Sequence, residues 1–175
     1  MQRQAIADEF RRIQSGICDH LERLDGSARF HSDHWLREEG GGGHTRVIAN
    51  GGLIEKGGVN FSEVFGPLSP AASKALKIEA NEFHATGVSI VLHGRNPWVP
   101  TIHMNIRYFE SGGQRWFGGG IDLTPMYFEP TATRHFHQRL KAVCDDWDPT
   151  FYPEYKHWAD EYFFLPHRNE THDID

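Results

Sequence analysis

The hydrophobic residues at the start of the chain follow a helical repeat. They recur at intervals of three and four residues, at Ile6, Phe10, Ile13, Ile17, Leu21 and Leu24. This spacing places them on one face of a helix and predicts an amphipathic α-helix that packs on a core. Gly26 follows directly, at a position where glycine commonly ends a helix.

A different pattern, with strand-like stretches between glycines, begins after residue 40 and predicts a β-sheet. In the glycine-rich region 40–66, residues 45–49 and 52–55 are predicted strands, and Asn50-Gly51 between them is a strong hairpin signal. Further strands are predicted at residues 87–93, 101–109 and 114–121, and the second of these alternates most regularly. Short loops between successive strands indicate an antiparallel sheet.

Helices are predicted on both sides of these strands in the sequence. Ser69-Pro70 opens one of them, because proline is tolerated at the first helical position. Residues 132–147 and 152–164 also have helical patterns, and the first of them has one apolar face formed by Phe136, Leu140, Val143 and Trp147. The expected fold is therefore α+β, in one domain that spans residues 1–175.

Charge and composition exclude several classes of function. A net charge of -6 argues against general nucleic-acid binding, although local arginines can still bind an anionic ligand. No apolar run approaches the ~20 residues that a membrane-spanning helix needs. Cys18 and Cys144 lie far apart without a Cys-x-x-Cys motif, which indicates free thiols in a reducing compartment. A cytoplasmic protein is the resulting expectation.

The regular strand at 101–109 carries the main candidate chemistry. Side chains alternate between the two faces of a strand, so His103, Asn105 and Arg107 share the face opposite Ile102, Met104, Ile106 and Tyr108. The first set combines a base, an amide and a permanent cation. On the neighbouring predicted strand, a similar row is formed by Ser89, Val91 and His93.

Two interpretations of this polar row remain open. A solvated face is common in antiparallel sheets. A binding site is favoured by the aromatic and glycine-rich surroundings, since Trp98 and Trp116 could wall a site for a large flat ligand. The glycines at 118–120, just before Asp122, would let a bulky ligand or another backbone approach, although a bulge or a tight strand exit also uses glycine.

Twelve histidines raise the question of a metal site. His135 and His137 lie two residues apart in a predicted helix, about 200° around its axis, and cannot readily share one metal. His93, His103 and His167 could converge with His137 in space. Their long spacing is unlike the short motifs of zinc sites, so the spacing alone does not predict a metal.

An ordered set of segments resembles the oxygen-dependent coproporphyrinogen III oxidases. The similarity runs from about residue 5 to residue 170, through segments 40–46, 50–62, 87–89, 96–97, 100–107, 116–125 and 162–168. The resemblance implies a large antiparallel sheet covered by helices on both sides, usually in a homodimer. It also implies oxidative decarboxylation of two propionates of coproporphyrinogen III to vinyl groups, with molecular oxygen as co-substrate and no organic cofactor.

The resemblance assigns roles to individual residues. His103 and Arg107 would form the catalytic centre, with His103 moving a proton. Ser89 would bind substrate, and the segment from Asn105 through Ile106 to Arg107 would hold it. We add Asp122 to the catalytic set, either as an acceptor for pyrrole N–H groups or as a partner that orients Arg107. Bacterial members are also described with a divalent metal at four histidines, which match His93, His103, His137 and His167.

The chain departs from the family pattern in two places. Gly94 stands where the family usually has proline, and the sequence ends soon after Glu170, where the family continues into a long C-terminal part. That part carries an Asp-Arg pair and much of the dimer contact, so weak or absent turnover is expected. The alternatives are a non-catalytic binder of an anionic tetrapyrrole and a histidine-rich metal-binding domain.

Overall fold

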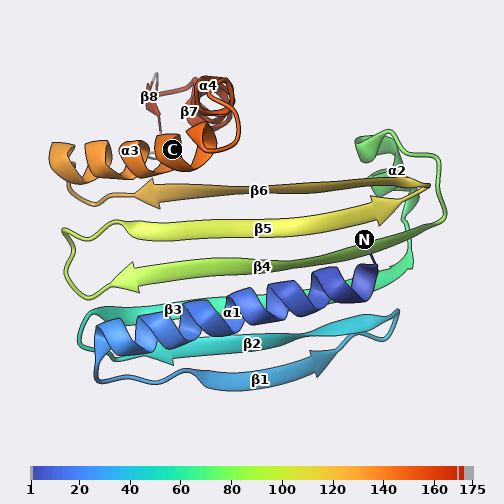
Figure 1. The fold of residues 1–175 in the computed structure, drawn as a ribbon, viewed down its shortest axis with the longest axis horizontal. Coiled ribbons are helices and arrows are strands. Elements are labelled where there is room, and N and C mark those ends of the chain that lie inside the picture. Colours follow the sequence, from blue (N-terminus) through green and yellow to red (C-terminus); the bar gives the residue numbers. More distant parts are fainter. Residues whose placement is uncertain (1, 169, 172–175) are drawn as a thin grey trace.

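The sheet predicted from the sequence is present and larger than expected. The computed structural model describes residues 2–168, 170 and 171. Six strands pair antiparallel in chain order (Figure 1): β1 (His31–Leu36), β2 (Gly41–Ala49), β3 (Ile54–Pro67), β4 (Glu82–Gly94), β5 (Thr101–Ser111) and β6 (Gln114–Thr124). The predicted α+β architecture with a large antiparallel sheet is therefore confirmed.

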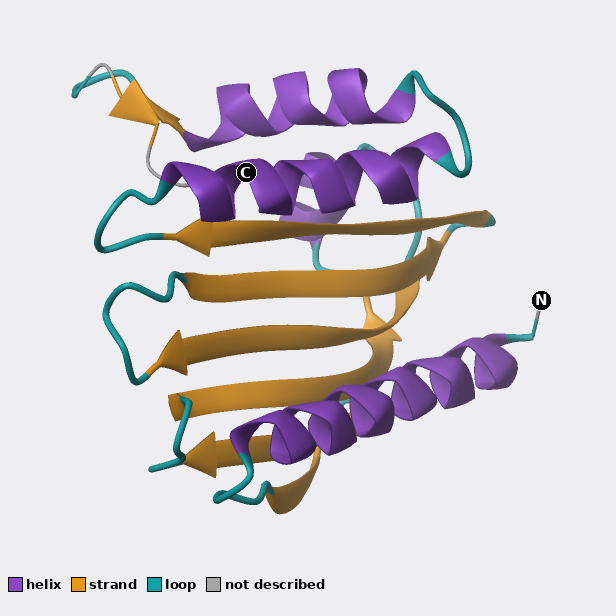
Figure 2. Ribbon diagram, turned by 60° about the vertical axis from the view of Figure 1, so that its left-hand side comes forward, coloured by secondary structure: helices purple, strands orange, loops and turns teal. Residues whose placement is uncertain are grey.

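The helices lie where the sequence predicts them. Helix α1 (Arg3–Asp25) crosses β3 and β4 diagonally (Figure 1), and Gly26, with φ 75°, ends it. The short α2 (Pro70–Leu76) interrupts the connection from β3 to β4, and the Ser69 side chain caps it. After β6, α3 (Pro130–Asp145) and α4 (Phe151–Phe163) pack against each other (Figure 2). Two-residue strands β7 (Phe164–Leu165) and β8 (Glu170–Thr171) follow.

The strand predictions differ from the structure mainly in extent. The predicted hairpin is confirmed, and Asn50 at its turn has φ 58°. β2 begins at Gly41, because glycine lets neighbouring strands and side chains approach closely; a Cβ at Gly43 would lie 2.4 Å from the Trp35 ring. β1 was not predicted, since the whole of its length is exposed and its sequence shows no alternation of apolar and polar residues.

The core lies between α1 and the sheet. Ile6 and Phe10 of the helix pack on apolar side chains of the central strands, namely Val59, Phe61, Val88, Ile90 and Tyr108. Gln14 is buried at this interface, and its Nε2 donates hydrogen bonds to the carbonyl oxygens of His44 (2.6 Å) and Val59 (2.8 Å). A buried polar group is tolerated when it is hydrogen-bonded, so Gln14 fixes the position of the helix over β2 and β3.

A buried carboxylate ties the end of α1 to the turn between β2 and β3. The Asp25 side chain accepts backbone hydrogen bonds from Ala28, Leu53 and Ile54, each at 2.9 Å. The N–H groups of Ile54, Ala28 and Leu53 hold the pKa of Asp25 far below its ordinary value. A Cβ at Gly51 would lie 2.2 Å from the carboxylate, so this turn is shaped around Asp25.

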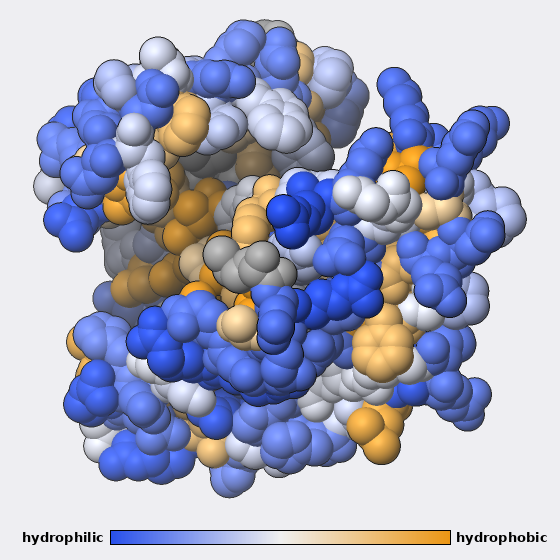
Figure 3. Space-filling model, turned by 45° about the vertical axis from the view of Figure 1, so that its right-hand side comes forward, coloured by the Kyte–Doolittle hydropathy of each residue, from blue (hydrophilic) through white to orange (hydrophobic). Residues whose placement is uncertain are grey.

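Part of the α1 side of the sheet remains uncovered near β6. Figure 3 shows a hollow with hydrophobic side chains in its walls, below the block of helices at the top of the molecule. A pocket of about 300 Å³ in this region is lined by Ile6, Tyr108, Arg115, Trp116 and Phe117. Phe117 is 61% exposed because α1 contacts β3 and β4 and does not reach across β6.

Replacing Asp25 with Asn should lower the midpoint of thermal unfolding at neutral pH by roughly 4 °C or more. The amide has a single acceptor oxygen and no charge for the backbone N–H groups that converge on it. The pKa of Asp25 is lower in the folded chain than in the unfolded chain, where it is ~3.9. The ionised carboxylate therefore stabilises the fold fully above the unfolded-state pKa, and this stabilisation is lost as the pH falls below it. The difference between wild type and variant should therefore narrow below about pH 4.

Differential scanning calorimetry at a series of pH values tests this expectation. Asp19→Asn is the matched control, because Asp19 is an exposed carboxylate on the same helix. If Asp25→Asn unfolds at the wild-type temperature at neutral pH, the carboxylate does not have this role.

Candidate functional site

The polar row of β5 lies on the face of the sheet that α1 does not cover. This face, opposite α1, is called the open face below. His103, Asn105 and Arg107 lie on it, while the alternate residues Ile102, Met104 and Ile106 pack against the core. In the β4–β5 register, Ser89 is opposite Asn105. The structure therefore brings Ser89 of β4 beside the row that the sequence predicts on β5.

His103 is paired with the carboxylate of Asp122. The two residues are opposite each other in the β5–β6 register, and the distance from His103 Nδ1 to Asp122 Oδ1 is 2.8 Å. The Asp122 side chain is 15% exposed and the His103 side chain 42%. An ionised carboxylate only accepts hydrogen bonds, so Nδ1 carries the proton and Nε2 is left as the acceptor of the neutral ring. This pairing was not foreseen from the sequence, which placed Asp122 beside Arg107 or the substrate.

Arg107 is held by its neighbour on the same face of the strand. Its Nη2 donates to Asn105 Oδ1 at 2.8 Å and its Nε donates to the same oxygen at 3.3 Å. The Arg107 side chain is exposed, so its remaining N–H groups can bind a carboxylate with two parallel hydrogen bonds. Asn105 thus orients the cation, a role that the sequence analysis had considered for Asp122.

Ile106, Trp98 and Trp116 are the other residues that the sequence analysis placed at the site. The side chain of Ile106 faces the core, so any contact of Ile106 with a ligand would involve its backbone. Trp98 lies in the loop before β5 and packs on Tyr127 at 4.8 Å, whereas Trp116 packs on Phe109 at 4.8 Å. The two tryptophans therefore lie towards opposite ends of the row on β5.

The three glycines of β6 at positions 118, 119 and 120 differ in the space around them. The register between β5 and β6 is regular throughout, which removes a bulge as the explanation. A Cβ at Gly119 would lie 2.2 Å from the Asn105 carbonyl oxygen, so the chain itself requires glycine there. At Gly120 nothing lies within 4 Å, and at Gly118 the nearest atom is 4.0 Å away. These two glycines leave space on the open face beside His103 and Arg107.

The four candidate metal-binding histidines do not converge. His93 lies near Thr101, with 3.4 Å between Nδ1 and Oγ1, and His137 Nδ1 is 3.1 Å from the Tyr152 hydroxyl in the α3–α4 pair. His167 lies in the turn after β7. Among residues 2–168, 170 and 171, no three His, Cys, Asp or Glu side chains come together as metal ligands do. The described residues therefore do not fit the metal site that the resemblance implied.

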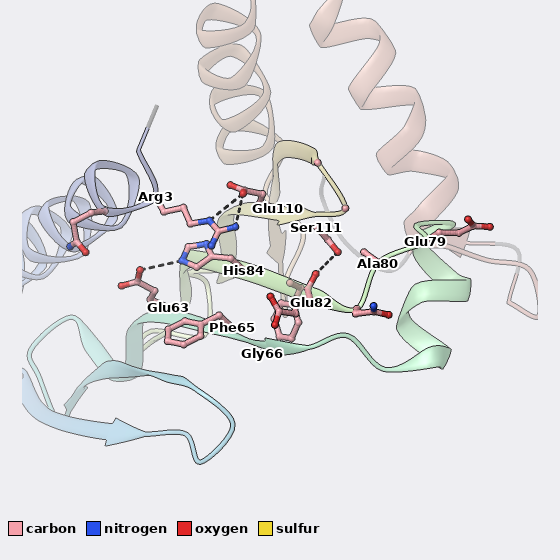
Figure 4. A pocket seen from close by; sticks show the side chains of 15 residues that line it. Arg3, Glu63, Phe65, Gly66, Glu79, Ala80, Glu82, His84, Glu110 and Ser111 are labelled. Atoms are coloured by element: carbon pink, nitrogen blue, oxygen red, sulfur yellow. Dashed lines mark hydrogen bonds and ion pairs between the residues drawn. The ribbon is translucent and has the colours of Figure 1, made fainter.

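A large groove lies elsewhere, at the end of the sheet where α1 begins (Figure 4). Its volume is about 910 Å³, and none of the site residues described above lines it. Two of its acidic side chains have partners: Arg3 Nη2 is 2.6 Å from Glu110 Oε1, and His84 Nε2 is 3.2 Å from Glu63 Oε1. The ion pair with Arg3 lowers the pKa of Glu110 to about 2. The Arg3–Glu110 pair connects α1 to β5, whereas the His84–Glu63 pair connects β4 to β3, and both lie outside the candidate site.

Comparing two glycine substitutions on β6 tests this description of the strand. Gly119→Ala should lower the thermal midpoint by roughly 4 °C or more, because the new methyl group meets a backbone oxygen and the strands must move apart. Gly120→Ala, one residue away, should leave the midpoint within about 2 °C, because the methyl group enters open space. Equal losses for both variants would contradict the geometry.

Comparisons with known proteins identify the family. A family model described as coproporphyrinogen III oxidase matches residues 5–174. Oxygen-dependent coproporphyrinogen-III oxidases of Prochlorococcus marinus are similar: the protein of strain MIT 9515 is 49% identical over 165 residues, and that of strain MIT 9312 is 49% identical over 164. Each alignment covers 93% of this chain and 48% of the relative, so the chain spans about half the length of these relatives. The chain belongs to the coproporphyrinogen III oxidase family.

Proposed function

We propose that the chain provides the substrate-binding and proton-transferring face of an oxygen-dependent coproporphyrinogen III oxidase. The observation that carries this proposal is the pair of oriented groups on one strand. His103 is fixed by Asp122, and Arg107 is fixed by Asn105, both on the open face. Since the matched relatives are about twice as long, the activity is proposed for this chain and rests on residues within it.

Substrate binding would begin with Arg107. Coproporphyrinogen III carries four propionates, so it is anionic at neutral pH. A guanidinium binds one carboxylate in a planar, two-bonded geometry, and the bond to Asn105 reduces the conformational freedom that binding would otherwise remove. Ser89, exposed and opposite Asn105, offers a neutral hydrogen bond to the same ligand.

Proton transfer would involve His103. Each propionate that becomes a vinyl group loses carbon dioxide, two electrons and a proton from the carbon next to the pyrrole ring. One oxygen molecule accepts the two electrons and two protons, one of which comes from the medium, and becomes hydrogen peroxide. With Nδ1 bonded to Asp122, Nε2 of His103 can accept or deliver a proton at the open face. No flavin, haem or nicotinamide is part of this proposal.

Several wider features belong to the same proposal. A homodimer and a cytoplasmic location are expected from the resemblance and from the two widely spaced cysteines. Among the described residues, no helix is long and apolar enough to cross a membrane. A non-catalytic tetrapyrrole binder uses the same Arg107 face and is distinguished by the experiment that follows.

Anaerobic addition of coproporphyrinogen III, followed by oxygen and chromatography of the porphyrins, tests the role of Arg107. We expect the wild-type chain to bind the substrate and to form a low level of vinyl product. Arg107→Ala should bind about 10-fold or more weakly, because a charge-assisted pair is lost. Binding without product would move the function to tetrapyrrole binding, and equal binding by both chains would refute the proposed site.

Asp122→Asn should separate chemistry from binding. Loss of the carboxylate removes the group that fixes the His103 ring, so product formation should fall about 100-fold or more. The dissociation constant for the substrate should change less than about threefold, since Arg107 and Asn105 remain. Asp19→Asn, at an exposed carboxylate of α1 and so on the other side of the sheet, is the control. Equal rates for Asp122→Asn and wild type would exclude this role.

A further inference from the structure

Polar residues of β2 and β3 extend the open face beyond the site described so far. Asn60 of β3 is opposite Ser89 of β4, and on its other side it is opposite Thr45 of β2. Ser62, two residues further along β3, lies on the same face and is opposite Gly87. The segment that contains Asn60 and Ser62 was singled out in the sequence, but the proposed function does not use it.

These residues form a continuous row across the sheet. Thr45, Asn60, Ser89 and Asn105 follow one another on four neighbouring strands, each opposite the next. At ~4.8 Å between strands, the row is about 15 Å long. We call these four residues, together with Ser62, the polar track. It begins at Asn105, the residue that holds Arg107, and runs away from the edge strand β6.

The middle of the polar track has hydrogen-bonding capacity that the chain does not use. In the part of the chain that the structure describes, the side chains of Asn60, Ser62 and Ser89 make no hydrogen bond. Asn60 and Ser89 are exposed, and Ser62 is half-buried. An asparagine amide has two N–H donors, so Asn60 can bind a carboxylate without a positive charge.

The surroundings of the polar track favour a ligand over simple hydration. Asparagine is depleted in β-strands, yet Asn60 and Asn105 both lie well inside long strands. Gly58 and Gly87 lie two residues from Asn60 and Ser89 on this face. A Cβ at Gly87 would lie 2.3 Å from the Ile106 carbonyl oxygen, so the packing of β4 on β5 already requires glycine there. At the far end, Trp35 Nε1 donates to Thr45 Oγ1 at 3.3 Å and places an aromatic ring there.

We propose that Asn60 and Ser62 form a second carboxylate anchor for the same tetrapyrrole, on the opposite side of Ser89 from Arg107. This inference rests on the proposed function. Arg107 can hold one carboxylate of the substrate, and a tetrapyrrole lying on the open face extends across several strands. Its other carboxylate arms then reach the neutral donors of β3, with Thr45 and Trp35 at the limit of the site.

Charge-changing variants of Asn60 test this anchor with coproporphyrin III, the air-stable oxidised form of the substrate, as the fluorescent probe. Asn60→Ala should weaken binding about 10-fold, because hydrogen bonds to a charged group are lost. Asn60→Asp should weaken it further by repulsion, and Asn60→Lys should restore or strengthen it. Ser62→Ala should weaken binding by a smaller factor of about three.

Two controls separate this inference from the proposed function. Asn81→Asp and Asn81→Lys change an exposed asparagine of the loop before β4, and both should bind like wild type, because charges beyond about 8 Å are screened at physiological salt. Thermal midpoints of all variants show whether the fold is kept. If Arg107→Ala weakens binding while the three Asn60 variants bind like wild type, the second anchor is wrong and the proposed function stands. If neither position affects binding, both proposals fail.

Discussion

The packing of α1 across β3 and β4 is the constraint on which the rest of the structure depends. The apolar face of the helix packs on one face of the sheet and buries it, through residues such as Phe10, Val59 and Val88. Strand alternation then requires that the intervening side chains lie on the other face. Asp25 and Gln14 fix the helix in this position through hydrogen bonds to backbone groups of β2 and β3 and of the turn between them. The chemistry of the open face is a consequence of this arrangement.

Pairs of neighbouring side chains give the open face its specific chemistry. On the open face, the side chain of His103 is held by Asp122 and that of Arg107 is held by Asn105. Without these partners, both side chains would be free to change rotamer. Oriented groups bind and react with less loss of conformational entropy than free ones.

The far end of the chain exposes a large apolar surface. No residue of α3 or α4 is buried, and apolar side chains such as Val143, Trp147 and Trp158 are more than half exposed. Phe117 of the edge strand β6 is also exposed, beside the hollow in Figure 3. Large exposed apolar surfaces commonly mark contacts with another polypeptide segment. The relatives, of which this chain matches about half, have further sequence that could form such contacts.

The sequence by itself determined the helix at the start, the hairpin at Asn50-Gly51 and the separation of His103, Asn105 and Arg107 from the core face. These features depend on local periodicity and turn chemistry, which can be read from neighbouring residues. The sequence also carried the family resemblance, because the matched segments are spread over nearly the whole chain.

Only the tertiary structure decided which residues are partners across strands. The register of the strands determines that Asp122 is opposite His103 and that Asn60 is opposite Ser89. This register cannot be inferred from the order of residues along a single strand. For the same reason it was the structure, and not the spacing of residues, that showed no group of three or more metal-ligand side chains among the described residues. Interactions between residues distant in sequence depend on the packing of the whole sheet, which the order of residues along one strand does not specify.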